Sequence, residues 1–252
     1  MLAESSLSGK RLAVLIDADN ANAKLIEPLL KEISKFGTAT VKRIYGDWTS
    51  PQLNSWKNKL NEFAILPMQQ FGYTTGKNST DSALIIDAMD LLYTEKFDGF
   101  CIVSSDSDFT RLASRIRESG LSVYGFGEQK TPGSFVAACD KFIYTEILEP
   151  LEKEKENNSL STANFENSKT FKSNRKLVKL LKDAYEAKAG EDGWANLGLL
   201  GNQLNQLSSS FDPRNFGYKK LGELFRNIDL FEVKEIPHKK NPLAKELLVK
   251  LK

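Results

Sequence analysis

Short apolar runs alternate with amphipathic stretches through the first 148 residues of this 252-residue chain. The runs are rich in β-branched and aromatic residues, which is typical of buried strands. Strands that alternate with helices and are almost continuously apolar predict an α/β fold, with a parallel sheet flanked by helices on both faces. The predicted strands are Leu12–Ile16, Thr40–Tyr45, Ile65–Phe71, Gly99–Val103, Leu121–Phe126 and Phe142–Ile147, and helical spacing predicts helices over 25–33, 53–63, 84–92 and 112–116.

The remainder of the chain has a different pattern. Residues 149–169 are rich in Glu, Lys, Asn and Ser and poor in apolar residues, which predicts a polar, solvated linker between domains 1–148 and 170–252. Beyond the linker, apolar positions predict three short helices followed by a hairpin of two strands. This order predicts a small winged-helix (α+β) domain. Its predicted helices cover 177–185, 197–204 and 218–225, and its predicted strands cover 230–236 and 246–251.

The net charge of +2 hides a division between the two predicted domains. Residues 1–148 hold 16 Lys and Arg against 18 Asp and Glu, a balance of −2. Residues 169–252 hold 17 against 10, a balance of +7. A basic module beside a module with acidic clusters indicates a polyanionic partner that one part holds and the other processes.

Several classes of function and location are disfavoured by composition. His238 is the only histidine, and Cys101 and Cys139 stand in apolar surroundings, so neither a zinc site nor histidine-based catalysis is expected. The two cysteines suit a reduced interior better than a disulfide. No apolar run approaches the length of a membrane span, and residues 1–10 lack the apolar core of a signal peptide. We therefore expect a cytoplasmic protein without a membrane partner.

Carboxylates follow two of the predicted strands and open one of the predicted helices. Asp17 and Asp19 come directly after the first strand, Asp106 and Asp108 come after the fourth, and Asp81 precedes the helical run that follows the third. Because the strands of a parallel sheet end at one common edge, we expect these side chains to converge in one crevice. Carboxylates gathered there would repel one another without a cation, and oxygen-only ligands suit hard ions. The sequence therefore predicts a Mg²⁺ or Mn²⁺ site.

Each of these residues also has a plain structural interpretation. An aspartate after a strand can cap the next helix, and Asp81 in a first helical turn can simply face the helix dipole. The recurrence of the pattern at two strand ends favours a shared site. Asp87 lies six residues beyond Asp81, off its helical face, and is a weaker ligand. Lys77, in the loop before Asp81, could reach a phosphate or could only be a solvated lysine.

Three stretches of the first domain carry a resemblance to a known family. Residues 16–20 read Ile-Asp-Ala-Asp-Asn, residues 80–84 read Thr-Asp-Ser-Ala-Leu, and residues 103–109 read Val-Ser-Ser-Asp-Ser-Asp-Phe. In order and spacing they resemble the NYN domain, a branch of the PIN-like nuclease superfamily. The resemblance implies metal-dependent RNA cleavage. Carried over by position, it implies that Asp17, Asp81, Asp106 and Asp108 hold the metal and that Asn20 is a supporting polar group that contacts nucleic acid.

The tail resembles the OST-HTH domain, also called LOTUS. Residues 194–198 read Trp-Ala-Asn-Leu-Gly, and residues 216–225 read Phe-Gly-Tyr-Lys-Lys-Leu-Gly-Glu-Leu-Phe. The resemblance implies RNA binding, for which Tyr218, Lys219 and Lys220 are the expected contacts. The apolar face of the third predicted helix is an alternative docking site for a protein partner.

Three functions remain open at this point. The first is a metal-dependent ribonuclease in which Asp17 and Asp106 are the central ligands. The second is a non-catalytic RNA-binding adaptor with a vestigial acidic site. The third is a phosphatase of the haloacid-dehalogenase type, because an aspartate pair after the first strand matches its nucleophile motif. That family expects Thr or Val shortly after the pair, whereas a helical pattern begins here at once, so the ribonuclease is favoured.

Overall fold

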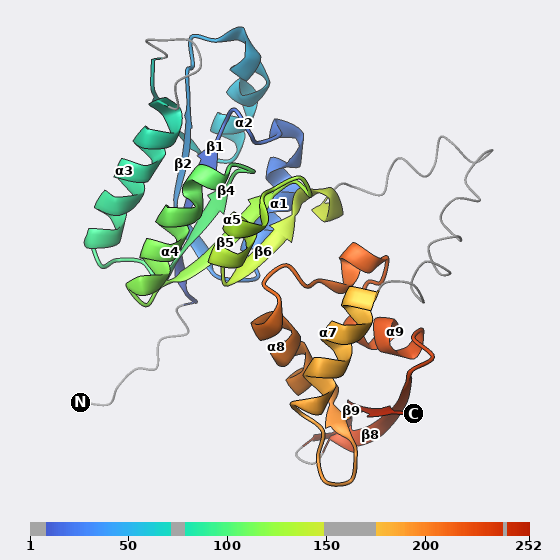
Figure 1. Ribbon diagram of the computed structural model, residues 1–252. Helices are drawn as coiled ribbons and strands as arrows, with labels where there is room; N and C mark the ends of the chain where they lie inside the picture. The colour runs from blue at the N-terminus through green and yellow to red at the C-terminus, as the bar shows by residue number, and fades with distance from the viewer. Residues whose placement is uncertain (1–8, 72–78, 149–174, 239–240) are drawn as a thin grey trace, which may run out of the picture. The chain divides into compact units, whose positions relative to one another are not determined.

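The computed structural model describes residues 9–71, 79–148, 175–238 and 241–252 (Figure 1). The chain divides into two compact units, Met1–Glu149 and Pro150–Lys252, and each is described by itself. The predicted linker 149–169 and Lys77 lie outside the described residues. Among those that are described, no helix combines the length and the apolar character needed to cross a membrane.

The first unit is built on a six-stranded sheet in which every neighbouring pair is parallel. The strand order is β3-β2-β1-β4-β5-β6, so β1 and β4 are the two central strands. All six predicted strands are present, and the α/β prediction is confirmed. The strands are β1 (Arg11–Asp17), β2 (Thr38–Gly46), β3 (Leu66–Gln69), β4 (Gly99–Val103), β5 (Ser122–Gly127) and β6 (Lys141–Tyr144).

Helices cover both faces of this sheet and bury a separate core on each. The helices of one face contribute to a core with Leu84, Leu112 and Phe135, and those of the other to a core with Leu29 and Trp56. The first face carries α3 (Ser79–Tyr93), α4 (Thr110–Glu118) and α5 (Gly133–Ala138). The second carries α1 (Ile26–Ile33), the 3₁₀ helix Pro51–Trp56 and α2 (Lys57–Glu62).

Alternation along β1 explains how one strand serves both cores. Leu12, Val14 and Ile16 pack into the core on the α1 face, whereas Ala13 and Leu15 pack into the core under α3 and α4. Successive side chains of a strand point to opposite faces, so a centrally placed strand must be apolar throughout. The same alternation places the last residue of the strand, an aspartate, on the α3 and α4 face.

Two elements of the first unit depart from the prediction. The strand expected over 142–147 ends at Tyr144, and the chain continues as a 3₁₀ helix, Thr145–Leu148. Helix α5 was not predicted. It is six residues long and consists of small and apolar residues after a proline, so it has no polar face from which a helical period could be read.

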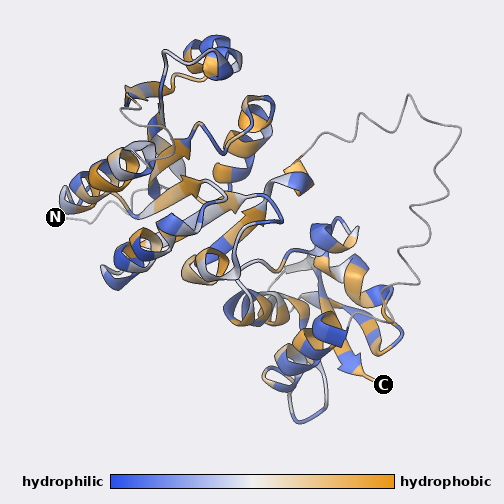
Figure 2. Cartoon of the chain, turned by 45° about the horizontal axis from the view of Figure 1, so that its top comes forward, coloured by the Kyte–Doolittle hydropathy of each residue, from blue (hydrophilic) through white to orange (hydrophobic). Residues whose placement is uncertain are grey.

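In its described residues, 175–238 and 241–252, the second unit combines three α-helices with a three-stranded antiparallel sheet of order β7-β9-β8. Its helices place apolar residues such as Leu181, Leu200 and Leu224 into one core with Val249 of the sheet. Figure 2 shows the corresponding alternation of apolar and polar residues along these helices. The elements are α7 (Arg175–Glu186), α8 (Leu197–Leu207), α9 (Leu221–Arg226), β7 (Ala195–Asn196), β8 (Phe231–His238) and β9 (Asn241–Leu251).

The third helix of this unit begins later than predicted. Gly217 has a left-handed backbone (φ 80°) and ends the 3₁₀ helix Pro213–Phe216, and Lys220 is extended. Helix α9 therefore starts at Leu221, and Tyr218 and Lys219 precede it. The two-residue strand β7 was not predicted, because a strand of that length has no alternation to detect.

Candidate metal centre

The direction in which successive strands are added reverses between β1 and β4. After β1 the chain builds β2 and β3 on one side, and it then returns to build β4, β5 and β6 on the other. In open parallel sheets such a reversal leaves a crevice outside the carboxyl ends of the two central strands, and ligands bind there. Asp17 is the last residue of β1, and the segment after β4 begins with Ser104.

Asp17 is held in place by three hydrogen bonds. Its carboxylate is buried, and Oδ2 accepts from Asn20 Nδ2 and from Ser104 Oγ, each at 2.8 Å. Oδ1 accepts from the backbone N–H of Asp19 at 3.1 Å. A buried carboxylate needs hydrogen-bond donors in place of water, and here both oxygens have them. Asp17 therefore has a fixed position at the crevice.

The segment after β4 repeats this local geometry. Asp106 Oδ1 accepts from the backbone N–H of Asp108 at 2.9 Å and caps the 3₁₀ helix Ser107–Phe109. The backbone N–H of Asp106 donates to Ser104 Oγ at 3.1 Å. Asp106, rather than Asp108, is thus the capping residue. The cap fixes the backbone of this loop and directs both aspartates to the crevice.

Three carboxylates from two elements meet there. Asp81 in the first turn of α3, Asp106 and Asp108 each offer one oxygen, and these oxygens lie within 4.8 Å of one another. Burial, together with the charges of neighbouring aspartates, raises the pKa of Asp81 from 3.8 to about 6. A set of partly buried carboxylate oxygens that repel one another is chemically suited to a hard divalent cation. These residues fit Mg²⁺ or Mn²⁺.

Asp17 stands beside this group rather than within it. Among the neighbouring charges, that of Asp17 has the largest effect in raising the pKa of Asp81. Burial and the charges of Asp17 and Asp47 likewise raise the pKa of Asp19. The structure thus brings three of the four expected ligands within mutual coordinating distance and places the fourth close enough to interact electrostatically.

Asp87 has a structural role. It pairs with Arg43 of β2 and accepts a hydrogen bond from the hydroxyl of Tyr45. Burial and the hydrogen bond to Asp87 raise the pKa of Tyr45, so the phenol stays protonated and remains a donor. This cluster ties α3 to β2 below the crevice and thereby supports the position of Asp81.

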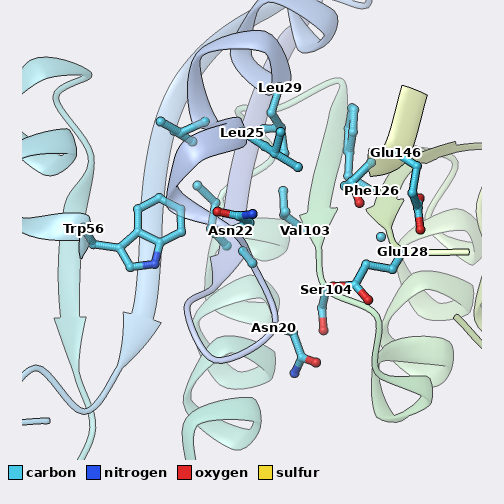
Figure 3. Close-up of a pocket in the computed structure, with 15 residues that line it drawn as sticks. Asn20, Asn22, Leu25, Leu29, Trp56, Val103, Ser104, Phe126, Glu128 and Glu146 are labelled. Carbon is cyan, nitrogen blue, oxygen red and sulfur yellow. The ribbon is translucent and has the colours of Figure 1, made fainter. Parts of the chain in front are cut away.

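A cavity of about 130 Å³ lies at the same edge of the sheet, on the opposite face (Figure 3). Asn20 and Ser104, the two side-chain donors to Asp17, belong to its lining. Gly127, at the end of β5, also borders it, and a Cβ atom there would lie 2.5 Å from the carbonyl oxygen of Ser104. This cavity could not be predicted from the sequence, because its walls come from five separate segments.

The expected RNA contacts of the second unit, Tyr218, Lys219 and Lys220, lie directly before α9. Lys219 and Lys220 are exposed, and the backbone N–H of Lys219 donates to Glu223 Oε2 at 3.1 Å. Tyr218 is half-buried and packs against the core of the unit. The two lysines are therefore available to a phosphate, whereas Tyr218 serves the core.

A second basic and aromatic group was not predicted. The Lys234 ammonium lies 3.6 Å from the ring centroid of Trp194, and the Lys250 ammonium lies 5.8 Å from the same centroid. Lys234 follows Val233 of β8, which is half-buried against the core, and Lys250 follows the buried Val249 of β9, so both lysines point to the face of the sheet away from the core. The alternation of apolar and polar residues along these strands would have predicted that orientation, but it could not have predicted that the lysines lie close to Trp194.

Two family models match the chain, one on each of its two units. A family model of the NYN domain matches residues 11–149, and a model of the OST-HTH/LOTUS domain matches residues 168–243. Among solved structures, the chain is similar to a protein of unknown function from Vibrio parahaemolyticus, with 18% identity, coverage of 55% of this chain and 94% of that chain, and a TM-score of 0.47. It is also similar to an uncharacterised protein of Nitrosomonas europaea, with 40% identity, coverage of 29% and 70%, and a TM-score of 0.26.

No curated protein matches the chain. The NYN match spans more than half of the sequence and falls on the unit that contains the parallel sheet and the acidic crevice. The shorter match falls on the region that contains the helices and the antiparallel sheet. The protein is accordingly a member of the NYN family within the PIN-like nuclease superfamily, and it carries an OST-HTH/LOTUS domain after its NYN domain.

Proposed function

We propose that this protein is a metal-dependent ribonuclease. The observation that carries the proposal is the meeting of Asp81, Asp106 and Asp108 at the crevice between the two central strands. These three carboxylates would hold Mg²⁺ or Mn²⁺, with Asp17 beside them. When bound, the metal supplies a nucleophilic water at neutral pH and stabilises charge on the phosphate oxygens.

The residues of the chain itself position this chemistry. Asn20 and Ser104 hold Asp17 in one orientation through hydrogen bonds to the same oxygen. The cap made by Asp106 fixes the loop that carries Asp108. Because each carboxylate is placed by the protein before substrate arrives, little reorganisation is needed in the reaction.

The second unit would hold the RNA. Residues 169–252 carry an excess of Lys and Arg over Asp and Glu. Two pairs of lysines lie on this unit: Lys219 with Lys220, and Lys234 with Lys250 beside Trp194. Lysines neutralise phosphates, and an aromatic ring can stack on a base without regard to sequence. Binding by this unit would raise the concentration of RNA at the acidic crevice.

Cleavage of RNA and DNA by the full chain with Mn²⁺, Mg²⁺ or chelator tests the proposal. Asp106→Asn is the informative variant, because asparagine can still cap the 3₁₀ helix while the charge is lost. Asp90→Asn, an exposed site on α3, is the matched control. We expect metal-dependent cleavage of RNA, a loss of at least about 100-fold in Asp106→Asn, and parental activity in the control.

Calorimetric titration with Mn²⁺ separates the alternatives. A ribonuclease should bind Mn²⁺ in the parent and weakly in Asp106→Asn. RNA binding without cleavage under every metal condition would favour the non-catalytic adaptor. Cleavage by Asp106→Asn at the parental rate would mean that the acidic crevice is not the active site.

A further inference from the structure

The cavity on the α1 face adjoins the acidic crevice through two residues that belong to both. Asn20 and Ser104 line the cavity, and each donates to the same oxygen of Asp17. In Figure 3 their side chains point away from the centre of the cavity, in the direction of the strand ends. A group bound in the cavity would therefore be separated from the Asp17 carboxylate by a single layer of side chains.

The walls of the cavity are suited to a flat, weakly polar ring. A cavity of similar size, about 150 Å³, in another protein accommodates benzene, so about 130 Å³ is enough for one six-membered ring. Apolar pockets with a few polar groups at the rim are the usual form of a small-ligand site. The apolar lining includes Ile16, Leu25, Leu29, Trp56, Val103 and Phe126.

Two glutamates form one side of the rim. Figure 3 shows Glu128 and Glu146 on the side of the cavity opposite Trp56. The backbone N–H of Gln129 donates to Glu146 Oε1 at 2.7 Å, and Lys130 pairs with Glu128 Oε2 at 2.8 Å. Each carboxylate has further lone pairs with which it can accept a hydrogen bond from a ligand.

This chemistry selects among the bases of RNA. A purine is larger than one six-membered ring, so a pyrimidine fits the volume better. Carboxylates accept from the exocyclic amine of cytosine, whereas uracil presents a carbonyl oxygen at the same position and would be repelled. We infer that the cavity binds a cytosine base of the RNA substrate, next to the phosphate that is cleaved. The placing of this cytosine next to the cleaved phosphate rests on the proposed ribonuclease function.

Binding can be tested without catalysis. Calorimetric titration of the full chain in chelator with cytidine monophosphate and uridine monophosphate measures base selection when no metal is present. We expect cytidine monophosphate to bind about tenfold more tightly. Leu29→Trp, which fills the cavity, should abolish binding, and Lys31→Trp, on the exposed side of α1, should not.

A second variant keeps the test informative if Leu29→Trp does not fold. In Glu128→Gln/Glu146→Gln the side chains keep their length, and glutamine can still accept from the Gln129 N–H. The preference for cytidine should fall to about twofold or less. Equal affinity for the two nucleotides in the parent, or an unchanged preference in the double variant, would overturn the inference.

Mapping of cleavage sites in an RNA pool of random sequence then tests the location. We expect cytosine at one fixed position relative to the cut, and loss of this preference among the cuts made by the double glutamine variant. Selective binding of cytidine monophosphate without cytosine at the cut would mean that the cavity takes free nucleotides, and the assignment to the RNA substrate would be wrong. If the parent cleaves no RNA, the proposed function fails, while the metal-free titration still decides whether cytosine binds.

Discussion

The hydroxyl of Ser104 donates a hydrogen bond of 2.8 Å to Oδ2 of Asp17, and so joins the ends of the two central strands. Both side chains are buried, each with 1% exposure. Ser104 Oγ also accepts from the backbone N–H of Asp106, so one hydroxyl connects the β1 carboxylate to the loop that carries the acidic group. The position of Asp17 therefore depends on a residue 87 positions away in sequence.

Ser104→Ala should destabilise the first unit by about 2 kcal/mol, because a buried carboxylate loses one of its donors. The measurement is the free energy of unfolding from denaturant titration at neutral pH. Ser107→Ala, an exposed serine in the same loop, is the control and should change stability by less than about 0.5 kcal/mol. Equal stability of the two variants would show that the Asp17 carboxylate does not need this donor.

Asp81 should make the metal-free protein sensitive to pH. Its pKa is raised from 3.8 to about 6, so the folded state binds this proton more tightly than the unfolded chain. The stability that this proton gives the folded state is fully present below about pH 4 and is lost as the pH rises through about 6. Asp81→Asn does not titrate. In chelator, its melting temperature should match that of the parent near pH 4 and exceed it above pH 6.

Thermal melts of both proteins between pH 4 and pH 8 give this difference directly. A difference that stays constant with pH would mean that the pKa of Asp81 is not raised. Added Mn²⁺ should remove the advantage of Asp81→Asn at neutral pH, because the cation relieves the repulsion in the parent and binds less well to the variant.

The two lysine pairs of the second unit should contribute unequally to RNA binding. Lys234→Glu/Lys250→Glu should weaken binding more than Lys219→Glu/Lys220→Glu, because the former pair flanks Trp194. The two variants have the same net charge, so each controls for the other. Titration of labelled RNA in the Asp106→Asn background, in which we expect cleavage to be lost, gives the affinities and their salt dependence. Loss of two phosphate contacts should reduce the salt slope by about 1.4.

Trp194→Leu distinguishes stacking from charge at this surface. Loss of one stacked base should cost about 1–3 kcal/mol of binding and leave the salt slope unchanged. If neither charge reversal nor Trp194→Leu alters RNA binding, the second unit would serve a protein partner instead.

Gly127→Ala should disturb the junction of the cavity and the crevice. Its Cβ atom would lie 2.5 Å from the carbonyl oxygen of Ser104 and 2.8 Å from Thr131 Oγ1, so the backbone must move. We expect a loss of about 1–3 kcal/mol in the free energy of unfolding. Gly133→Ala is the control, since nothing lies within 4 Å of the added atom. Equal stability of the two variants would contradict the close packing at β5.

Much of the fold follows from local patterns. The run Leu12–Ile16 is apolar at every position, which is what a strand buried on both faces requires, and α1 and α4 show clear amphipathic spacing. The strand order was not readable, because it depends on how connections cross the sheet. Helix α5 and strand β7 were missed, because both are too short for a period to be seen.

Part of the site could also be predicted from local patterns in the sequence. Residues at the ends of adjacent parallel strands must share an edge, so the approach of Asp106 and Asp108 to the crevice could be expected. The hydrogen bonds of Asp17 could not, because Ser104 has no feature in the sequence that distinguishes it from Ser105. Nor could the pairing of Asp87 with Arg43 and Tyr45, which depends on the packing of α3 against β2.

Asn20 and Ser104 face two sites at once, and thermodynamic reciprocity follows from that position. Whatever factor an occupied cavity applies to the affinity for the divalent ion, the ion must apply the same factor to the affinity for the base. If the factor favours both, the concentration of free Mn²⁺ or Mg²⁺ would set how strictly a base is chosen, as well as how fast RNA is cut. A cell could then alter the choice of transcripts through its metal supply, without any change in the protein.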